Sequence, residues 1–189
     1  GARPDGSLYT GQGTGAAETW RVEEMAPVLR LDGVAAHMVL PPMNPDYSQG
    51  ITLEAWVRHE AFPSWSRVFD LGNGPGSDNI LLANAGATTD LSFQVLRGDQ
   101  ARFITAPGAL VANAWAHLAA TVDASGYGRL YKNGVQVAHG PMQLPRNLQR
   151  ARSYVGKSNC AQDGFLRGLV AEVRMWTYAR SGDQIAASM

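Results

Sequence analysis

The stretch ITLEAWVRH, residues 51–59, alternates between two sets of side chains without a break. In an extended chain Leu53, Ala55 and Val57 point to one face. The opposite face holds Thr52, Glu54, Trp56 and Arg58. This period of two predicts a β-strand that places its aliphatic face in a protein core.

Similar short runs lie on both sides of this stretch and are separated by Gly, Pro, Asn and Asp. The expected strands cover residues 28–31, 36–40, 68–71, 79–83, 91–96, 101–106, 115–122, 153–155 and 166–176, with a hairpin over 128–140. One short helix is expected at the end, where Ser181 and Gln184 have the spacing of a capping box. The pattern predicts an all-β protein, an antiparallel β-sandwich, and excludes a doubly wound sheet and a helical bundle. It leaves immunoglobulin and jelly-roll topologies open.

The hairpin has the clearest local signal in the chain. In GRLYKNGVQVAHG, residues 128–140, the pair Asn133-Gly134 separates two strand-like runs. A two-residue type I′ turn needs positive φ at both central positions, which Asn and Gly adopt at low cost. We therefore expect the chain to reverse direction at these two residues.

The composition narrows the class of protein. Sixteen basic and sixteen acidic residues give a formal net charge of zero, which does not favour a nucleic-acid groove or a polybasic membrane patch. The single cysteine, Cys160, excludes an intrachain disulfide and a zinc site with several thiolates. No apolar run reaches the roughly 18 residues of a membrane-spanning helix. We expect neither a nucleic-acid partner nor membrane insertion, and the oligomeric state is not indicated.

The chain divides into two parts that differ in composition and in hydrophobic periodicity. Residues 1–24 are rich in Gly, Ala, Ser and Thr and have no periodicity, which indicates a lead-in arm. No signal peptide is visible there, and the start is typical of an excised or processed chain. From residue 25 to residue 189 the strand pattern continues and indicates one domain of sufficient size to bury a core.

Six pieces of the sequence, in order, resemble the laminin-G-like, concanavalin-A-like jelly-roll domains of bacterial surface and secreted proteins. They are LRLDG (29–33), ITLEAWV (51–57), WAHLAATVD (115–123), LYKNGVQV (130–137), YVG (154–156) and FLRGLVAEVRMWTYARSGDQI (165–185). The resemblance implies a jelly roll of two curved sheets, a secreted or cell-surface location, and recognition of a glycan or an extracellular protein. Ala171 departs from the family pattern, which often has Asp there.

An enzymatic function has little support in the sequence. A retaining glycosidase needs two carboxyl groups about 5–5.5 Å apart, and no strand has the Asp/Glu-x-Asp/Glu pattern that would place them so. Glu54 is expected to be a partly buried carboxylate that is hydrogen-bonded or paired with an Arg. His117 is expected to make a local hydrogen bond, and no nucleophile elbow is present. We expect a non-catalytic module, with a jelly-roll glycoside hydrolase or a purely structural spacer as alternatives.

The stretch RVFDLGNGPGSDNILL, residues 67–82, joins two expected strands through a loop rich in Gly, Asn and Asp. It lacks the helix of a phosphate-binding loop and breaks the EF-hand pattern at the third position. Residues 73–80 approximate a single calcium-binding β-helix repeat, but such sites form only between stacked repeats. The prediction is a structured rim loop in which Asp70 and Asn73 accept backbone N–H groups.

This loop and a neighbouring tryptophan form the predicted ligand-binding patch: Trp65, Asn73, Asp78 and Asn79. An indole ring stacks on the apolar faces of sugars, while amides and carboxylates bind their hydroxyl groups. The alternative for Trp65 is that its ring folds back over an edge of the core.

A calcium ion is the one cofactor that the family resemblance implies. Asp32 and Asp70, each at a junction between a strand and a turn, are the predicted ligands, because calcium prefers hard oxygen donors. Ala171, which replaces a carboxylate, counts against the site.

Overall fold

The computed structural model describes residues 27–189, so the predicted arm over residues 1–24 lies outside the described residues. Its strands are β1 (Val28–Asp32), β2 (Met38–Leu40), β3 (Ile51–His59), β4 (Arg67–Gly72), β5 (Ile80–Asn84), β6 (Leu91–Arg97), β7 (Gln100–Ala106), β8 (Trp115–Val122), β9 (Tyr127–Lys132), β10 (Val135–Pro141), β11 (Arg152–Val155) and β12 (Arg167–Trp176). A short helix, α1 (Gly182–Ala187), follows the last strand. All ten strands expected from the sequence and both arms of the hairpin are present.

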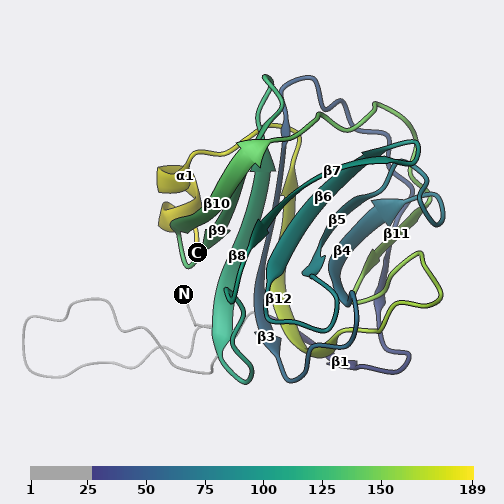
Figure 1. Ribbon diagram of the computed structural model, residues 1–189, viewed down its shortest axis with the longest axis vertical. Coiled ribbons are helices and arrows are strands. Elements are labelled where there is room, and N and C mark those ends of the chain that lie inside the picture. Colours follow the sequence, from purple (N-terminus) through teal and green to yellow (C-terminus); the bar gives the residue numbers. More distant parts are fainter. Residues whose placement is uncertain (1–26) are drawn as a thin grey trace, which may run out of the picture.

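The strands form two six-stranded antiparallel sheets that face each other (Figure 1). The first sheet has the order β1-β12-β3-β8-β9-β10, and the second has the order β2-β11-β4-β5-β6-β7. Strands that are distant in the sequence are neighbours in both sheets, such as β3 and β12. The predicted all-β, antiparallel jelly-roll sandwich with a short C-terminal helix is confirmed.

The core lies between the two sheets. From the first sheet Leu53, Ala55 and Val57 point inward and are 0–1% exposed, as the alternation predicted. From the second sheet Phe69 and Phe93 meet them and are equally buried. Their burial removes aromatic and aliphatic surface from water, at about 25 cal/mol per Å² of apolar area.

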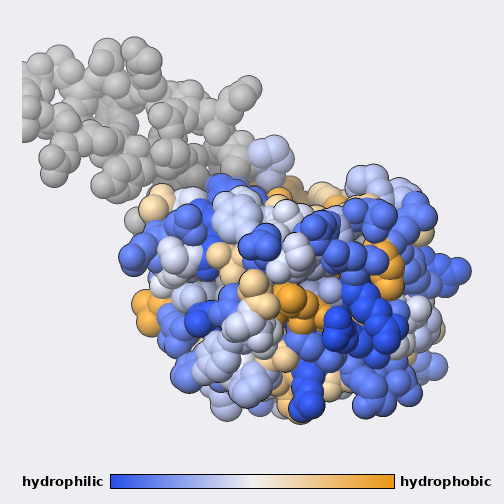
Figure 2. Space-filling model, turned by 90° about the horizontal axis from the view of Figure 1, so that it is seen from above, coloured by the Kyte–Doolittle hydropathy of each residue, from blue (hydrophilic) through white to orange (hydrophobic). Residues whose placement is uncertain are grey.

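The outer surface has no broad apolar face in the view of Figure 2, where hydrophobic side chains form small patches among hydrophilic ones. No helix within residues 27–189 has the length and apolar character needed to cross a membrane.

The predicted hairpin is confirmed between β9 and β10. Asn133 has φ of 51° and Gly134 has φ of 76°, so both central residues have the positive φ of a type I′ turn. The Asn133 side chain also accepts a hydrogen bond from the His117 backbone N–H at 2.9 Å, which ties the turn to β8.

Replacing Gly134 with Val is expected to destabilise the protein by about 1 kcal/mol or more, because a β-branched residue resists positive φ. A Cβ atom there would also lie 3.1 Å from Cβ of Ala186 in α1. Chemical denaturation measures the change. The matched control is Gly134→Asn, which tolerates positive φ and should cost less; equal stability of Gly134→Val and the wild type would contradict the turn.

The outer face of β3 is buried as well, which the alternation did not predict. Thr52 and Glu54 are both 0% exposed because the segment after β12 covers them. The Thr52 hydroxyl donates to the backbone carbonyl of Tyr178 at 2.8 Å and accepts from the backbone N–H of Arg180 at 2.9 Å. The segment 178–188 therefore covers the central part of the outer face of the first sheet.

Helix α1 holds this segment in place. The predicted capping box is present, since Ser181 accepts from the Gln184 backbone N–H and the Gln184 side chain accepts from the Ser181 N–H. Ile185 is the fully buried side chain of the helix, and it packs with Ala119 and Tyr131 of the first sheet.

Glu54 is paired with an Arg, as predicted, but it is fully rather than partly buried. The Arg180 guanidinium donates to Glu54 Oε1 at 2.5 Å, and His117 Nε2 lies 3.4 Å from Glu54 Oε2. The same guanidinium lies over the Trp176 ring, 4.3 Å from its centroid. This cluster serves to attach the C-terminal segment.

Candidate functional site

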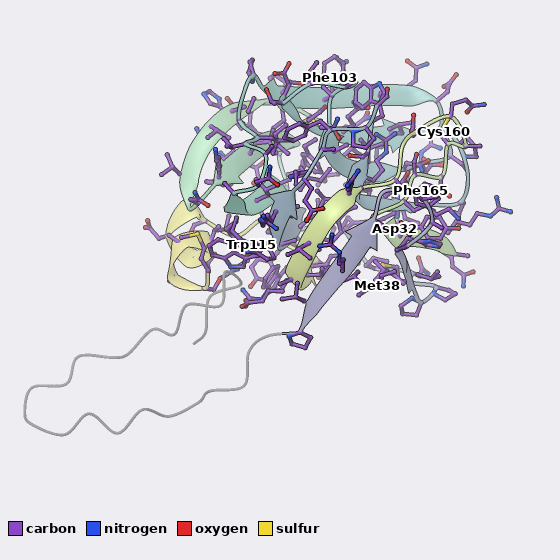
Figure 3. The ribbon with its side chains drawn as sticks, turned by 90° about the horizontal axis from the view of Figure 1, so that it is seen from below. Asp32, Met38, Phe103, Trp115, Cys160 and Phe165 are labelled. Atoms are coloured by element: carbon purple, nitrogen blue, oxygen red, sulfur yellow. The ribbon has the colours of Figure 1, made fainter. Side chains whose placement is uncertain are left out.

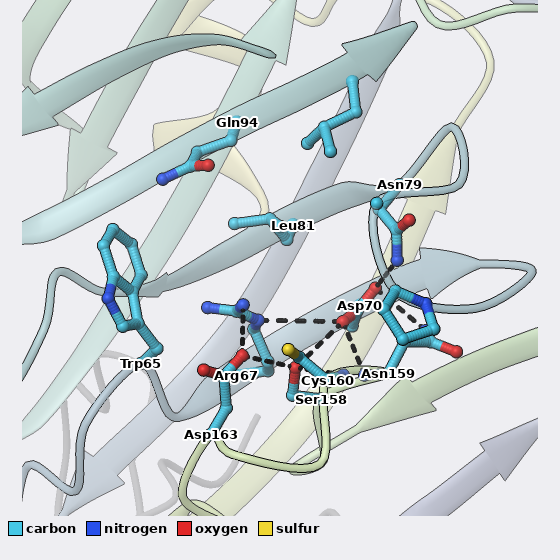
Figure 4. Close-up of a pocket in the computed structure, with 13 residues that line it drawn as sticks. Trp65, Arg67, Asp70, Asn79, Leu81, Gln94, Ser158, Asn159, Cys160 and Asp163 are labelled. Atoms are coloured by element: carbon cyan, nitrogen blue, oxygen red, sulfur yellow. Dashed lines mark hydrogen bonds and ion pairs between the residues drawn. The ribbon is translucent and has the colours of Figure 1, made fainter. Parts of the chain in front are cut away.

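A pocket of about 280 Å³ lies on the outer face of the second sheet. Its floor comes from strands β4 to β6 and consists of Arg67, Asp70, Leu81, Gln94 and Leu96. Three loops complete the walls with Trp65, Pro75, Gly76, Asn79, Ser158, Asn159, Cys160 and Asp163. Figure 4 shows these side chains converging on one space from strands and loops that are far apart in the sequence.

Trp65 stands at one side of the pocket (Figure 4). Its φ of 52° turns the chain sharply just before β4, and its backbone N–H donates to the Gly86 carbonyl at 2.8 Å. The Arg67 guanidinium lies 5.5 Å from the centroid of the indole ring, a cation–π contact. The ring is half-buried and lines the pocket, as the ligand-binding interpretation requires.

Arg67 occupies the floor beside this ring and is only 7% exposed. One of its terminal nitrogens donates to Asp163 Oδ2 at 2.6 Å, and its Nε lies 3.7 Å from Asp70 Oδ2. Its other terminal nitrogen has no hydrogen-bond partner among residues 27–189. A buried guanidinium N–H without an acceptor has an uncompensated desolvation cost, which an acceptor that reaches it would remove.

Asp70 is the centre of the polar network and is 1% exposed. It accepts from Asn79 Nδ2 at 2.7 Å and from the backbone and side-chain N–H groups of Asn159 at 2.9 and 3.0 Å. The Ser158 hydroxyl lies 3.5 Å from Asp70 and donates to Asp163 Oδ2 at 2.6 Å. The network fixes the walls of the pocket to its floor. Asp70 accepts from a backbone N–H, as predicted, but this N–H belongs to Asn159 and not to the loop that follows Asp70.

The structure separates the four residues predicted to bind a ligand into two pairs. Trp65 and Asn79 line the pocket, whereas Asn73 and Asp78 do not. Asn73 bonds the backbone of Gln149 and Ala151 at 2.7 and 2.8 Å. Asp78, with φ of 55°, accepts from the Gly98 backbone N–H at 2.8 Å. These two side chains hold loops together and do not line the pocket that Asn79 lines.

Sequence reasoning missed Arg67 and Gln94 on the floor of the pocket, and it also missed the wall residues from the loop after β11. Ser158, Asn159 and Asp163 reach Asp70 and Arg67 across some 90 residues of sequence, with separations of 88, 89 and 96. The one local signal for them was the density of Asn, Asp and Ser around Cys160.

The two predicted calcium ligands lie on different sheets, Asp32 in β1 and Asp70 in β4. Asp32 Oδ1 accepts three backbone N–H groups, from Val34, Ala35 and Ala36, at 2.8 to 2.9 Å, and these bonds lower the Asp32 pKa to about 2. Both carboxylates are thus occupied by N–H donors, which compete with a cation. Within residues 27–189 no cluster of three His, Cys, Asp or Glu suits a metal. Calcium stays a prediction.

The pocket does contain two carboxylates, Asp70 and Asp163, although no single strand has them both. Both are engaged by Arg67 and the Ser158 hydroxyl. Glycoside hydrolysis requires one carboxyl to protonate the leaving oxygen and the other to face the sugar or a water. In this pocket both carboxylates are already held by a shared cation and a shared hydroxyl group of the protein.

Comparison with known structures shows the same fold in three other proteins. Domain 4 of AbnA, a GH43 extracellular arabinanase from Geobacillus stearothermophilus in complex with arabinotriose, matches with a TM-score of 0.64 and 19% identity over 80% of this chain and 71% of that one. The CBM40 of the Ruminococcus gnavus IT-sialidase, bound to α2,3-sialyllactose, matches with a TM-score of 0.62 and 13% identity over 81% and 96%. A heptameric SAP-like pentraxin from Limulus polyphemus matches with a TM-score of 0.61 and 13% identity over 88% and 82%.

A search of curated protein sequences found no match. A laminin-G family model, described as concanavalin A-like lectin/glucanases superfamily, matches residues 32–186. This range spans every strand from β2 to β12 and most of α1. The chain therefore belongs to the concanavalin A-like lectin/glucanases superfamily, as a laminin-G-like jelly-roll domain.

Proposed function

We propose that this chain is a non-catalytic carbohydrate-binding module and that the pocket beside Trp65 is its binding site. The observation that supports this most directly is the composition of the pocket. An indole ring, the apolar side chains of Leu81 and Leu96, and several amide and carboxylate groups line one concave space. Sugars present apolar ring faces and polar hydroxyl edges, so they suit a surface of this mixed kind.

The polar groups are already positioned before a ligand arrives. Asn79, Asn159 and Asp70 are fixed to one another by hydrogen bonds of 2.7 to 3.0 Å. A preorganised site loses little conformational entropy on binding, which favours affinity. Arg67 adds an unpaired N–H donor at the floor. The AbnA domain in complex with arabinotriose and the CBM40 bound to sialyllactose have the same fold, which supports a carbohydrate rather than a protein ligand here.

Such a module works as part of an exported or cell-surface protein, where polysaccharides are encountered. The family membership supports this location. A single module of this size is expected to bind weakly, and repeated copies or neighbouring domains would raise the effective affinity.

Trp65→Ala is expected to lower the affinity for a glycan at least tenfold, about 1.4 kcal/mol, because it removes the stacking surface. A glycan array, run with calcium and with a chelator, identifies the glycan, and calorimetry measures the affinity. The melting temperature should change little, since the ring is half-buried and borders the pocket. Trp65→Phe should keep part of the affinity.

Asp78→Ala is the matched control. Its side chain accepts from Gly98 and lies 3.4 Å from Arg146, outside the pocket, so this change should reduce stability and leave affinity unchanged. Normal binding by Trp65→Ala would place the site elsewhere.

The hydrolase alternative has its own test. It would be favoured if the wild type releases reducing sugar from the bound glycan and Asp163→Asn does not.

A further inference from the structure

A row of directly paired residues leads from the pocket to an aromatic side chain at the edge of the second sheet. Asp70 pairs with Leu81, Leu81 with Gln94, and Gln94 with Phe103. Directly opposed residues of neighbouring antiparallel strands place their side chains on the same face. Phe103 therefore shares the face on which the pocket lies, next to Gln94, which lines the pocket.

Phe103 is 62% exposed, while its neighbour in the strand, Ile104, is 7% exposed and belongs to the core. Figure 3 shows Phe103 at the border of the molecule, on the outer side of the sheet. An isolated exposed apolar residue is common on protein surfaces and by itself indicates nothing. The position of this ring, in register with the floor of the pocket, is what connects it to binding.

The spacing of strands sets the length of a ligand that touches both places. Neighbouring strands lie about 4.8 Å apart, so Leu81 in β5 and Phe103 in β7 are separated by about 10 Å across the sheet. One sugar ring, similar in width to a phenyl ring, does not cover both positions. A chain of sugars that crosses the strands does.

The surface along this path has no charge. The side chains of β5, β6 and β7 that share this face by register are Leu81, Ala83, Ser92, Gln94, Leu96, Ala101, Phe103 and Thr105. At the floor of the pocket the single guanidinium of Arg67 is already engaged by two carboxylates, Asp70 and Asp163, which leaves one net negative charge. A uronic or sialic acid carboxylate would meet repulsion there, whereas a neutral sugar would not.

We propose that the site binds a linear, neutral oligosaccharide, with one unit in the pocket beside Trp65 and later units crossing Gln94 to stack on Phe103. This inference rests on the proposed function and adds a second binding position and a ligand class to it. Stacking on an exposed aromatic ring gives affinity without requiring a particular hydroxyl pattern.

The test uses ladders of neutral oligosaccharides, namely arabino-, xylo- and manno-oligosaccharides from the disaccharide to the hexasaccharide, with oligogalacturonides as acidic counterparts. Calorimetry on the wild type should show affinity that rises with chain length and weaker binding of the acidic ladder. Phe103→Ala should lower affinity for the longer members about tenfold and leave the shortest bound member unchanged. The matched control is Val135→Ala, which changes a 66% exposed apolar residue of the first sheet.

The outcomes separate the two proposals. If Phe103→Ala binds every length as the wild type does while Trp65→Ala loses binding, the second position is wrong and the pocket remains. Tighter binding of the acidic ladder than of the neutral ladders would overturn the ligand class. If Trp65→Ala also binds normally, or no sugar binds at all, both proposals fall.

Discussion

Arg180→Ala is expected to lower the free energy of unfolding by about 3–5 kcal/mol, because it leaves the carboxylate of Glu54 buried without its cation. Glu54 is 0% exposed, and the Arg180 guanidinium donates to it at 2.5 Å. The same side chain also donates to the Ser188 hydroxyl and the Gln184 carbonyl, at 2.9 and 2.6 Å. One substitution therefore removes the charge partner and two contacts of the C-terminal segment.

Urea denaturation of the wild type and the variant measures this loss. Arg30→Ala is the matched control, because Arg30 pairs with Glu60 at 3.2 Å while 66% of its side chain is exposed, and exposed ion pairs contribute at most about 1 kcal/mol. Adding Glu54→Gln to Arg180→Ala should recover part of the loss, since the buried charge is then gone. Similar losses for Arg30→Ala and Arg180→Ala would show that burial of Glu54 is not what makes the pair important.

Acidification from about pH 6.5 to pH 4 is expected to lower the free energy of unfolding by about 3 kcal/mol through His59 alone. Burial lowers the pKa of His59 from 6.5 to about 4, and the ring is 3% exposed. Its Nε2 has no hydrogen-bond partner within the described part of the chain. Between these two pH values the unfolded chain binds a proton at His59 and the folded protein does not, so stability falls as the pH falls.

The variant that tests this is His59→Leu, which has no titratable group and a similar volume. Over the same pH range, the free energy of unfolding of this variant should fall by about 3 kcal/mol less than that of the wild type. His139→Gln, which removes an exposed histidine, should leave the wild-type pH dependence intact. Parallel pH profiles for the wild type and His59→Leu would contradict the lowered pKa.

The strands were predictable because their signal is local. The alternation over Ile51–His59 gave the bounds of β3 without error, and Asn133-Gly134 gave the turn between β9 and β10. Each signal depends on the geometry of a few consecutive residues: two-residue periodicity for a strand and positive φ for the turn.

The site was only half predictable because its contacts are not local. Trp65 and Asn79 were found from their residue types, but Asp163 approaches Arg67 from 96 residues away. Asp78 and Asn79 are adjacent and chemically similar, yet only Asn79 lines the pocket. Which of two neighbours faces a pocket depends on backbone angles at the loop, here φ of 55° at Asp78, and composition does not specify these angles.

The position of α1 on the first sheet indicates where this protein can be coupled to a label or a solid surface. The helix packs on the outer face of the first sheet, whereas the pocket lies on the outer face of the second, so the two are on opposite sides of the sandwich. The side chain of Met189, just after the helix, is 41% exposed. A dye, a sensor chip or a bead coupled at this position would leave the face with the pocket directed outward.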